Sequence, residues 1–161
     1  MRTIPGRQLL EQLGIDYFKG GSSFGALSDQ AITYLLEKGE VLQLSTEDRL
    51  FACDDPVDGF FIILQGSIAF YRPREGGSTH IRDYIFGQEV GFVAMIGLHD
   101  RVGDTYAAEP SFVLHVSTAL FNELHMDLPN EFGVFLLNIS REMARRLQES
   151  DRKLADNAID E

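Results

Sequence analysis

The chain has 161 residues, of which 44% are hydrophobic and 24% charged, a composition typical of a globular domain rather than a disordered or fibrous chain. Its 25 acidic and 14 basic residues give a formal net charge of −11, which opposes direct DNA binding. Apolar runs such as Phe60 to Leu64 are far too short to cross a bilayer, and the N-terminus lacks the apolar segment of a secretory signal. With Cys53 as the only cysteine, we expect a cytoplasmic protein without membrane association.

Two short helices are predicted near the N-terminus. Leucines at helical spacing predict the first over residues 7–13, and the Gly-Gly-Ser-Ser run at 20–23 predicts a linker after it. Ser28 followed by Asp29 is a typical helix N-cap, and the apolar residues behind it predict a second helix that ends before Gly39.

The middle of the chain changes to a strand pattern. From Val41 to about residue 117 it consists of short stretches rich in Ile, Val, Phe and Tyr, separated by turn signals such as Asp58-Gly59 and Gly76-Gly77. Many short strands with frequent turns predict an antiparallel sandwich or barrel.

Helical spacing returns at the C-terminal end. Ser117 is a predicted cap for a short helix through Leu124, and Pro129 precedes a long helix to about Ala155. The apolar residues of the long helix form one stripe of Phe132, Phe135, Leu136, Ile139, Met143 and Leu147. This stripe either packs on the core or forms a seam with a second copy of the helix. Its basic residues, among them Arg146, predict a solvated face paired with Glu142 and Glu149.

Catalytic motifs are not found in this sequence. The four histidines occur singly, without metal-ligand spacing. No serine lies in a nucleophile elbow, and Asp54-Asp55 beside Pro56 is typical of a turn. We therefore expect no enzyme, no metal and no cofactor.

One segment between the predicted strands indicates a binding site. Gly87 and Gly91 bracket a predicted single helical turn over residues 92–96, and Arg101 follows. Exposed N–H groups beside a guanidinium favour a negatively charged ligand, and a phosphate suits them.

These features together resemble the cyclic-nucleotide-binding domain of the cAMP receptor protein (Crp/Fnr-like) family over residues 27 to 154. The residues that carry the resemblance are the Asp58–Gly66 hairpin, the glycine-bracketed turn, Arg101 and the long-helix segment Met143–Gln148. The resemblance implies a mainly β fold with flanking helices, an antiparallel β-barrel or jelly roll (double-stranded β-helix) with N-terminal helices and a long C-terminal helix. It divides the chain into an N-terminal helix and linker (1–26) and a binding domain (27–161), with a β-roll at about 41–117 and C-terminal helices at 118–155.

The resemblance also implies roles for individual residues. Backbone groups of Gly91, Phe92, Val93 and Ala94 would cradle a cyclic phosphate, with Arg101 as its arginine. Phe92 replaces the family's ribose-binding glutamate, and Val102 replaces a hydroxyl residue after the arginine. Ser150 stands where the long helix offers a hydroxyl to adenine. Glu47 and Asp54 replace strand-turn glycines common in the family.

Two functions follow as hypotheses. The first is a stand-alone regulatory domain, without a DNA-binding module because only seven residues follow Leu154; it would bind cAMP, cGMP or a related phosphate ligand and signal through its C-terminal helix. The alternative is a degenerate, ligandless module for dimerisation or interaction with an unknown protein partner. We expect a homodimer through the helix of residues 130–155. A Phe92 ring inside the cavity beside Arg101 favours the second hypothesis, whereas a ring outside it leaves room for a sugar.

Overall fold

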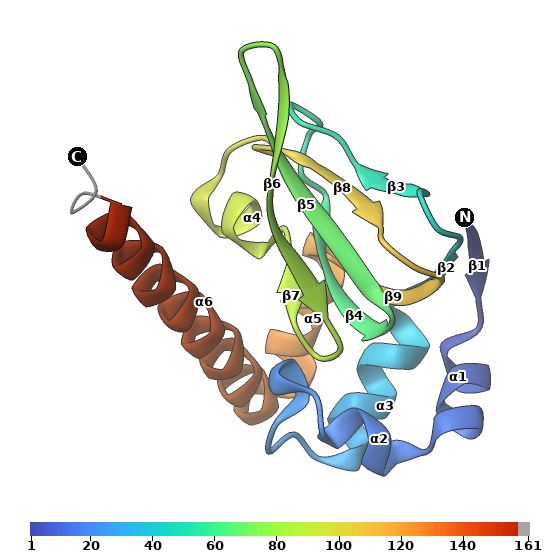
Figure 1. Ribbon diagram of the computed structural model, residues 1–161. Helices are drawn as coiled ribbons and strands as arrows, with labels where there is room; N and C mark the ends of the chain where they lie inside the picture. Colours follow the sequence, from blue (N-terminus) through green and yellow to red (C-terminus); the bar gives the residue numbers. More distant parts are fainter. Residues whose placement is uncertain (158–161) are drawn as a thin grey trace.

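The computed structural model describes residues 1–157 and consists of two packed antiparallel sheets flanked by helices (Figure 1). The first sheet has the order β1 (Arg2–Ile4), β2 (Glu40–Leu44), β9 (Ser111–Ser117), β4 (Gly59–Gln65) and β7 (Glu89–Val90). The second has the order β3 (Arg49–Phe51), β8 (Asp104–Ala107), β5 (Ser67–Arg74) and β6 (Gly77–Ile85). Most neighbours, such as β2–β9, β4–β9 and β5–β8, are distant in sequence, as in a roll, and all pairs are antiparallel, which confirms the predicted antiparallel β fold.

The helices lie at the two ends of the chain, apart from one between the strands. They are α1 (Gly6–Leu13), α2 (Ile15–Lys19), the 3₁₀ helix η1 (Ser22–Phe24), α3 (Asp29–Lys38), α4 (Phe92–Gly97), α5 (Thr118–Asp127) and α6 (Pro129–Asn157). The predicted caps are confirmed, because the Ser28 hydroxyl accepts from Ala31 N and the Ser117 hydroxyl from Leu120 N, each at 3.1 Å.

Strand β4 organises the core because both of its faces are covered. Phe60, Ile62 and Leu64 pack with the helices, whereas Phe61 and Ile63 face the interior between the sheets. Alternate residues of a strand point to opposite faces. A continuous apolar run is therefore what a strand buried on both sides requires.

The N-terminal segment differs from its prediction in two places. Residues 2–4 form β1, which pairs with β2 and which the sequence did not reveal. The expected linker at 20–23 is instead packed: Ser23 is buried, its N–H donates to Gly87 O at 2.9 Å, and its carbonyl accepts from Asn138 of α6 at 3.2 Å. A Cβ on Gly21 would lie 2.8 Å from Gly87 Cα. Small residues are needed here for close backbone approach rather than for flexibility. The expected domain boundary after residue 26 stays a prediction.

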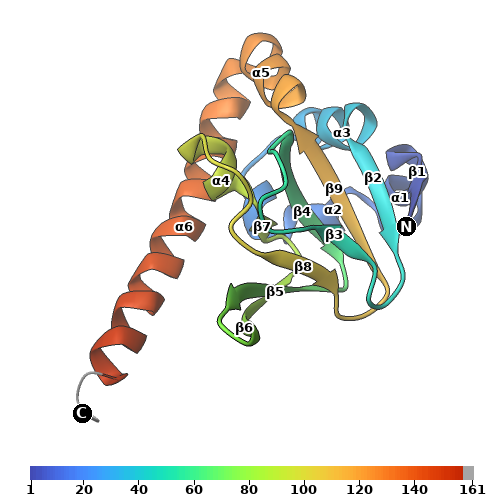
Figure 2. The ribbon, with the colours of Figure 1, turned by 90° about the horizontal axis from the view of Figure 1, so that it is seen from above.

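Helix α6 packs on the body through its first half and extends away from it through its second (Figures 1 and 2). Phe135 and Ile139 are fully buried, whereas Leu147 is 64% exposed. Of the two arrangements considered for the stripe, packing on the core is therefore found at Phe135 and Ile139 but not at Leu147 within a single chain. Although α6 has 29 residues, neither it nor any other helix within residues 1–157 is apolar enough to cross a membrane.

Two strand turns carry Glu47 and Asp54, the residues that the resemblance places at positions where glycine is common. Glu47 and Asp54 have φ angles of 70° and 66°, the left-handed region in which glycine is favoured. Both turns keep a conformation that suits glycine although the glycine itself is absent.

Candidate functional site

Helix α4 sits where the first sheet ends, on the side of the barrel that faces α6 (Figures 1 and 2). It has six residues, one more than predicted, and follows Gly91, whose φ is 90°. A Cβ at Gly91 would run into Nη1 of Arg101. Glycine is therefore required twice at this position, by the backbone conformation and by the guanidinium beside it.

Arg101 is held by backbone carbonyls and by an aromatic ring. Its Nη1 donates to Gly91 O at 3.0 Å and its Nη2 to Gly59 O at 2.7 Å. The guanidinium lies over the Phe51 ring, with 4.3 Å from Cζ to the ring centroid, a cation–π contact. Asp58, 75% exposed, places Oδ1 3.7 Å from Nη2. The arginine is therefore positioned by two backbone carbonyls and an aromatic ring, and its carboxylate partner is the exposed Asp58.

The charge of Arg101 is only partly compensated. The residue is 3% exposed, and within the described residues its Nε has no hydrogen-bond partner. Burial lowers the pKa of Arg101, while Asp58 and Asp55 act to raise it. Because arginine stays protonated in proteins, the site presents a buried cation with a free donor, which attracts an anion.

The Phe92 ring points away from this cationic site. Phe92 is fully buried, and its ring centroid lies 5.0 Å from that of Phe60 and 5.8 Å from that of Phe121. These rings belong to the helix-side core. Of the two arrangements considered for Phe92, the structure shows the ring outside the cavity, and this leaves room for a sugar.

A cavity of about 190 Å³ opens beside Arg101 and has Gly91, Val93, Ala94 and Val102 in its wall. Phe92 does not line it. A second cavity of about 260 Å³ contains Ser150 and shares Tyr84, Val93 and Arg146 with the first. Ser150 Oγ donates to Arg146 O within α6 at 2.9 Å. The predicted residues, except for the Phe92 side chain, thus line two adjacent cavities beside α6, which are together called the hollow below.

Two charged residues of this region were not assigned to the site from the sequence. Arg146 lines both cavities, and its guanidinium pairs with the fully buried carboxylate of Glu89. The prediction of a solvated face is therefore wrong for Arg146 and for the buried Glu142, which pairs with the exposed Arg145 at 3.0 Å; Lys153 and Glu149 pair at 2.7 Å on the solvated face. The signal that identifies Arg146 in the sequence is helical spacing. Glu142 follows the buried Ile139 by three residues, and Arg146 follows Glu142 by four, so both lie on the face of the helix that Phe135 and Ile139 bury.

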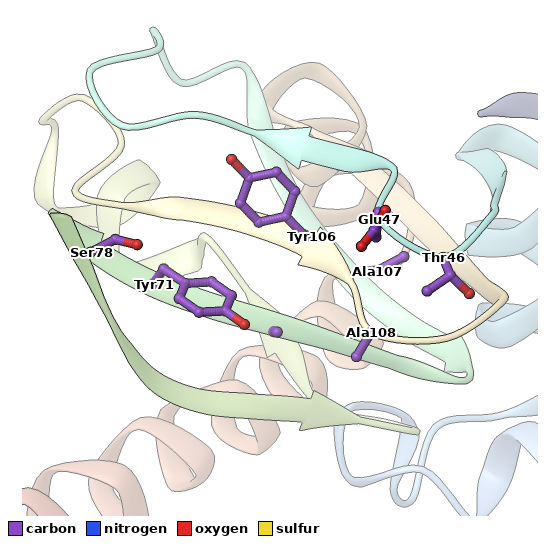
Figure 3. A pocket seen from close by; sticks show the side chains of 8 residues that line it. Thr46, Glu47, Tyr71, Ser78, Tyr106, Ala107 and Ala108 are labelled. Atoms are coloured by element: carbon purple, nitrogen blue, oxygen red, sulfur yellow. The ribbon is translucent and has the colours of Figure 1, made fainter.

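A further cavity, of about 590 Å³, lies on the second sheet and lacks a basic wall (Figure 3). Tyr71 and Tyr106 flank it with ring centroids 6.0 Å apart, and Glu47 closes one end. A cavity wall with one carboxylate and two tyrosines does not favour the binding of a phosphate. This cavity is larger than the one beside Arg101, but it lacks the chemistry of an anion site. Within residues 1–157 no group of three or more His, Cys, Asp or Glu side chains is arranged to hold a metal ion.

Substituting Gly91 tests the position of Arg101. Gly91→Ala is expected to lower the free energy of unfolding by about 2–3 kcal/mol, because it combines backbone strain with displacement of the guanidinium. Gly76→Ala is the matched control: φ is +80° there too, but nothing lies within 4 Å of the added Cβ. Strain alone then costs about 1 kcal/mol. Chemical denaturation measures both, and equal losses would contradict the close packing of Arg101 on Gly91.

Comparison with known proteins places this geometry in context. The sequence model described as Cyclic nucleotide-binding domain matches residues 41–127, more than half of the chain. No curated protein matches the sequence. Among solved structures, the chain is similar to a cyclic nucleotide-binding domain from Methylobacillus flagellatus KT, with a TM-score of 0.81 and 21% identity over 96% of this chain and 88% of that chain.

Two longer proteins share the fold. The Catabolite Activator Protein of Thermus thermophilus has a TM-score of 0.73 and 19% identity, covering 86% of this chain and 63% of that one. The c-di-GMP responsive global regulator CLP of Xanthomonas campestris has a TM-score of 0.74 and 17% identity, covering 81% of this chain and 65% of that one. The chain therefore spans just under two thirds of either protein, and at these identities the likeness concerns the fold.

Proposed function

Because the chain belongs to the cyclic nucleotide-binding domain family, we propose that it binds a cyclic nucleotide or a related phosphate ligand beside Arg101 and signals through α6. The environment of Arg101 carries the proposal: a buried guanidinium with an unpartnered Nε lines a cavity from which the Phe92 ring is absent. The family is generally regulatory and non-catalytic. A ligand that favours one position of α6 over another would supply the signal.

The size of the hollow supports a ligand with two parts. The cavity at Arg101, about 190 Å³, is smaller than the roughly 300–1,000 Å³ usual for small-molecule sites. The adjoining cavity beside Ser150 adds about 260 Å³. A phosphate beside Arg101 and a base beside α6 would use both.

The ribose contact is where binding is expected to be weak. Phe92 stands at the position of the family's glutamate and its ring lies in the core, so no carboxylate of that residue reaches a 2′-hydroxyl. A hydrogen bond to a charged group contributes about 1.5–3 kcal/mol. Its loss weakens binding by about ten- to a hundredfold without abolishing it.

Isothermal titration calorimetry with cAMP, cGMP and cyclic di-GMP tests the proposal. We expect saturable heat with at least one of the three, and a rise in melting temperature with the same ligand. No heat and no thermal shift at millimolar concentrations of all three would overturn it.

We also propose that two copies of the chain pair through α6. Four apolar residues of α6 have the spacing of a coiled-coil seam, with intervals of seven, four and seven residues: Leu136, Met143, Leu147 and Leu154. Leu147 and Leu154 are 64% and 68% exposed in the single chain. A second helix packed on this seam would bury both leucines.

Leu147→Arg is expected to yield a monomer. Placing a charge in the seam of both copies should raise the dimer dissociation constant at least about 100-fold, because two buried leucines contribute about 1.5–3 kcal/mol each. Leu137→Arg is the matched control, since Leu137 is also exposed but lies off the seam. Sedimentation velocity distinguishes the variants. Equal dissociation by both, or a wild-type monomer at high micromolar concentration, would contradict the seam.

A second candidate function is a ligandless module that dimerises or binds a protein partner. The small cavity beside Arg101 and the exposed seam favour it. It predicts an α6 dimer that persists while all three nucleotides give no heat. The same calorimetry and sedimentation experiments therefore separate the two functions.

A further inference from the structure

Glu89 and Arg146 join the barrel to α6 at the point where the helix leaves the body. The Glu89 side chain is fully buried in β7, and its Oε2 accepts from Phe92 N at 3.2 Å. Its Oε1 pairs with Arg146 Nη2, and its backbone carbonyl accepts from Arg146 Nη1 at 3.3 Å. One residue of the barrel therefore binds this arginine through both side chain and main chain.

The same arginine forms part of the wall of the proposed ligand site. The Arg146 side chain is 15% exposed, and its guanidinium lies 5.4 Å from the centroid of the Tyr84 ring. Among the described residues that line the two cavities there are four arginines and no acidic residue: Arg72, Arg82, Arg101 and Arg146. The whole chain has a net charge of −11, whereas the walls of these two cavities are positively charged. An anion in the hollow meets Arg101 from the barrel and Arg146 from α6.

We propose that Arg146 is a second anion-binding residue of this pocket and that a ligand phosphate competes with Glu89 for its guanidinium. The inference rests on the proposed function and adds to it which residue of α6 contacts the ligand. Carboxylate and phosphate suit the same planar donors of an arginine. In a partly buried site the two anions also repel each other, so each weakens the binding of the other.

This competition connects the pocket to the position of α6. Glu89–Arg146 is one of two adjacent polar contacts between the β7 turn and the helix; the other joins Gln88 Nε2 to Glu142 Oε1 at 3.2 Å. Beyond them α6 is exposed, with Leu147 at its surface. A ligand that draws Arg146 away from Glu89 removes one of the two contacts. By linkage, the ligand weakens the Glu89–Arg146 pair by the same free energy by which that pair weakens ligand binding.

The test compares nucleotide affinity in two charge-removing variants. Glu89→Gln keeps the shape of the side chain and an oxygen for Phe92 N, but it removes the competing charge. We expect the dissociation constants for cAMP, cGMP or cyclic di-GMP to fall about tenfold. Arg146→Gln removes the proposed contact, and we expect the same constants to rise at least tenfold. Because both variants break a buried ion pair, both should lower the melting temperature.

Opposite effects on affinity distinguish this role from a purely structural one. If the pair only holds the fold together, both substitutions weaken binding in parallel with the loss of stability. The double variant Glu89→Gln/Arg146→Gln provides a further test. It should bind the nucleotide like Arg146→Gln alone, because the Glu89 carboxylate competes with the ligand only when residue 146 carries a guanidinium. Arg146→Lys keeps the charge without the paired donors. It should bind a few-fold more weakly than wild type at nearly unchanged stability, which provides a readout if Arg146→Gln does not fold.

The outcomes separate this inference from the function on which it rests. If wild type binds a nucleotide, Arg101→Leu abolishes binding and Glu89→Gln fails to tighten it, the competition is disproved while the proposed function stands. If neither wild type nor Glu89→Gln binds any of the three nucleotides at millimolar concentration, both are disproved.

Discussion

Phe92→Glu is expected to destabilise the protein strongly rather than to restore ribose binding. The Phe92 ring is fully buried against Phe60 and Phe121. Replacing it removes a large apolar side chain and places an unpaired carboxylate in an aromatic core. We expect a loss of at least about 4 kcal/mol in the free energy of unfolding. For a domain of this size that corresponds to a fall in melting temperature of roughly 8–16 °C.

Thermal unfolding followed by circular dichroism measures this effect, with Phe92→Leu as the control. Leucine keeps the apolar character and part of the volume, so its cost should be at most about 3 kcal/mol. If Phe92→Glu keeps the wild-type melting temperature and binds cAMP more tightly, the side chain turns into the cavity instead. The position of the ring in the core would then not be what separates this chain from the family pattern.

Arg101→Leu is expected to abolish ligand binding and to weaken the fold at the same time. Leucine removes the cation of the pocket and leaves the carbonyls of Gly91 and Gly59 without their donors. Unsatisfied buried acceptors cost about 1–3 kcal/mol each, so we expect the two carbonyls to lower stability by roughly 2–6 kcal/mol. Nucleotide affinity should fall at least roughly 100-fold, because charge-assisted hydrogen bonds to the phosphate are lost.

Arg74→Leu separates the local role of Arg101 from its contribution to net charge. Arg74 is exposed in the β5–β6 hairpin and does not line either cavity of the proposed site. It changes the charge of the chain by the same amount. Calorimetry and denaturation of the two variants should show no more than a few-fold change for Arg74→Leu. Equal losses of affinity in both would mean that general electrostatics, not Arg101, attracts the ligand.

The proposed pocket differs from the family pattern by exchanging one kind of contact for another. Phe92 stands at the position of the family's ribose-binding carboxylate, and its ring packs in the core. Arg146 of α6 adds a further cation to the cavity wall. Ligands rich in phosphate should therefore gain relative to ligands held mainly by their sugar. The relative affinities of cAMP, cGMP and cyclic di-GMP report this balance.

Much of the fold is predictable from local patterns. The caps at Ser28 and Ser117 and the strand region after Val41 depend on neighbours within a few residues, and all three are found in the structure. Strand β1 was missed because three residues carry too little periodicity to be distinguished from a coil. Residues 20–23 were mistaken for a linker because glycine and serine serve equally in flexible chains and in close backbone contacts.

The sequence alone determined the central strand region between the predicted helices, the glycine-bracketed turn before α4 and the arginine that follows it, because these depend on spacing and backbone preference along the chain. The direction of the Phe92 ring, the carbonyl partners of Arg101 and the pairing of Glu89 with Arg146, 57 residues away, were decided only by the tertiary structure. Side-chain direction and ion pairing depend on which distant surfaces meet. In this protein those surfaces are the barrel and α6 as far as Arg146, and their packing selects which charges are buried together.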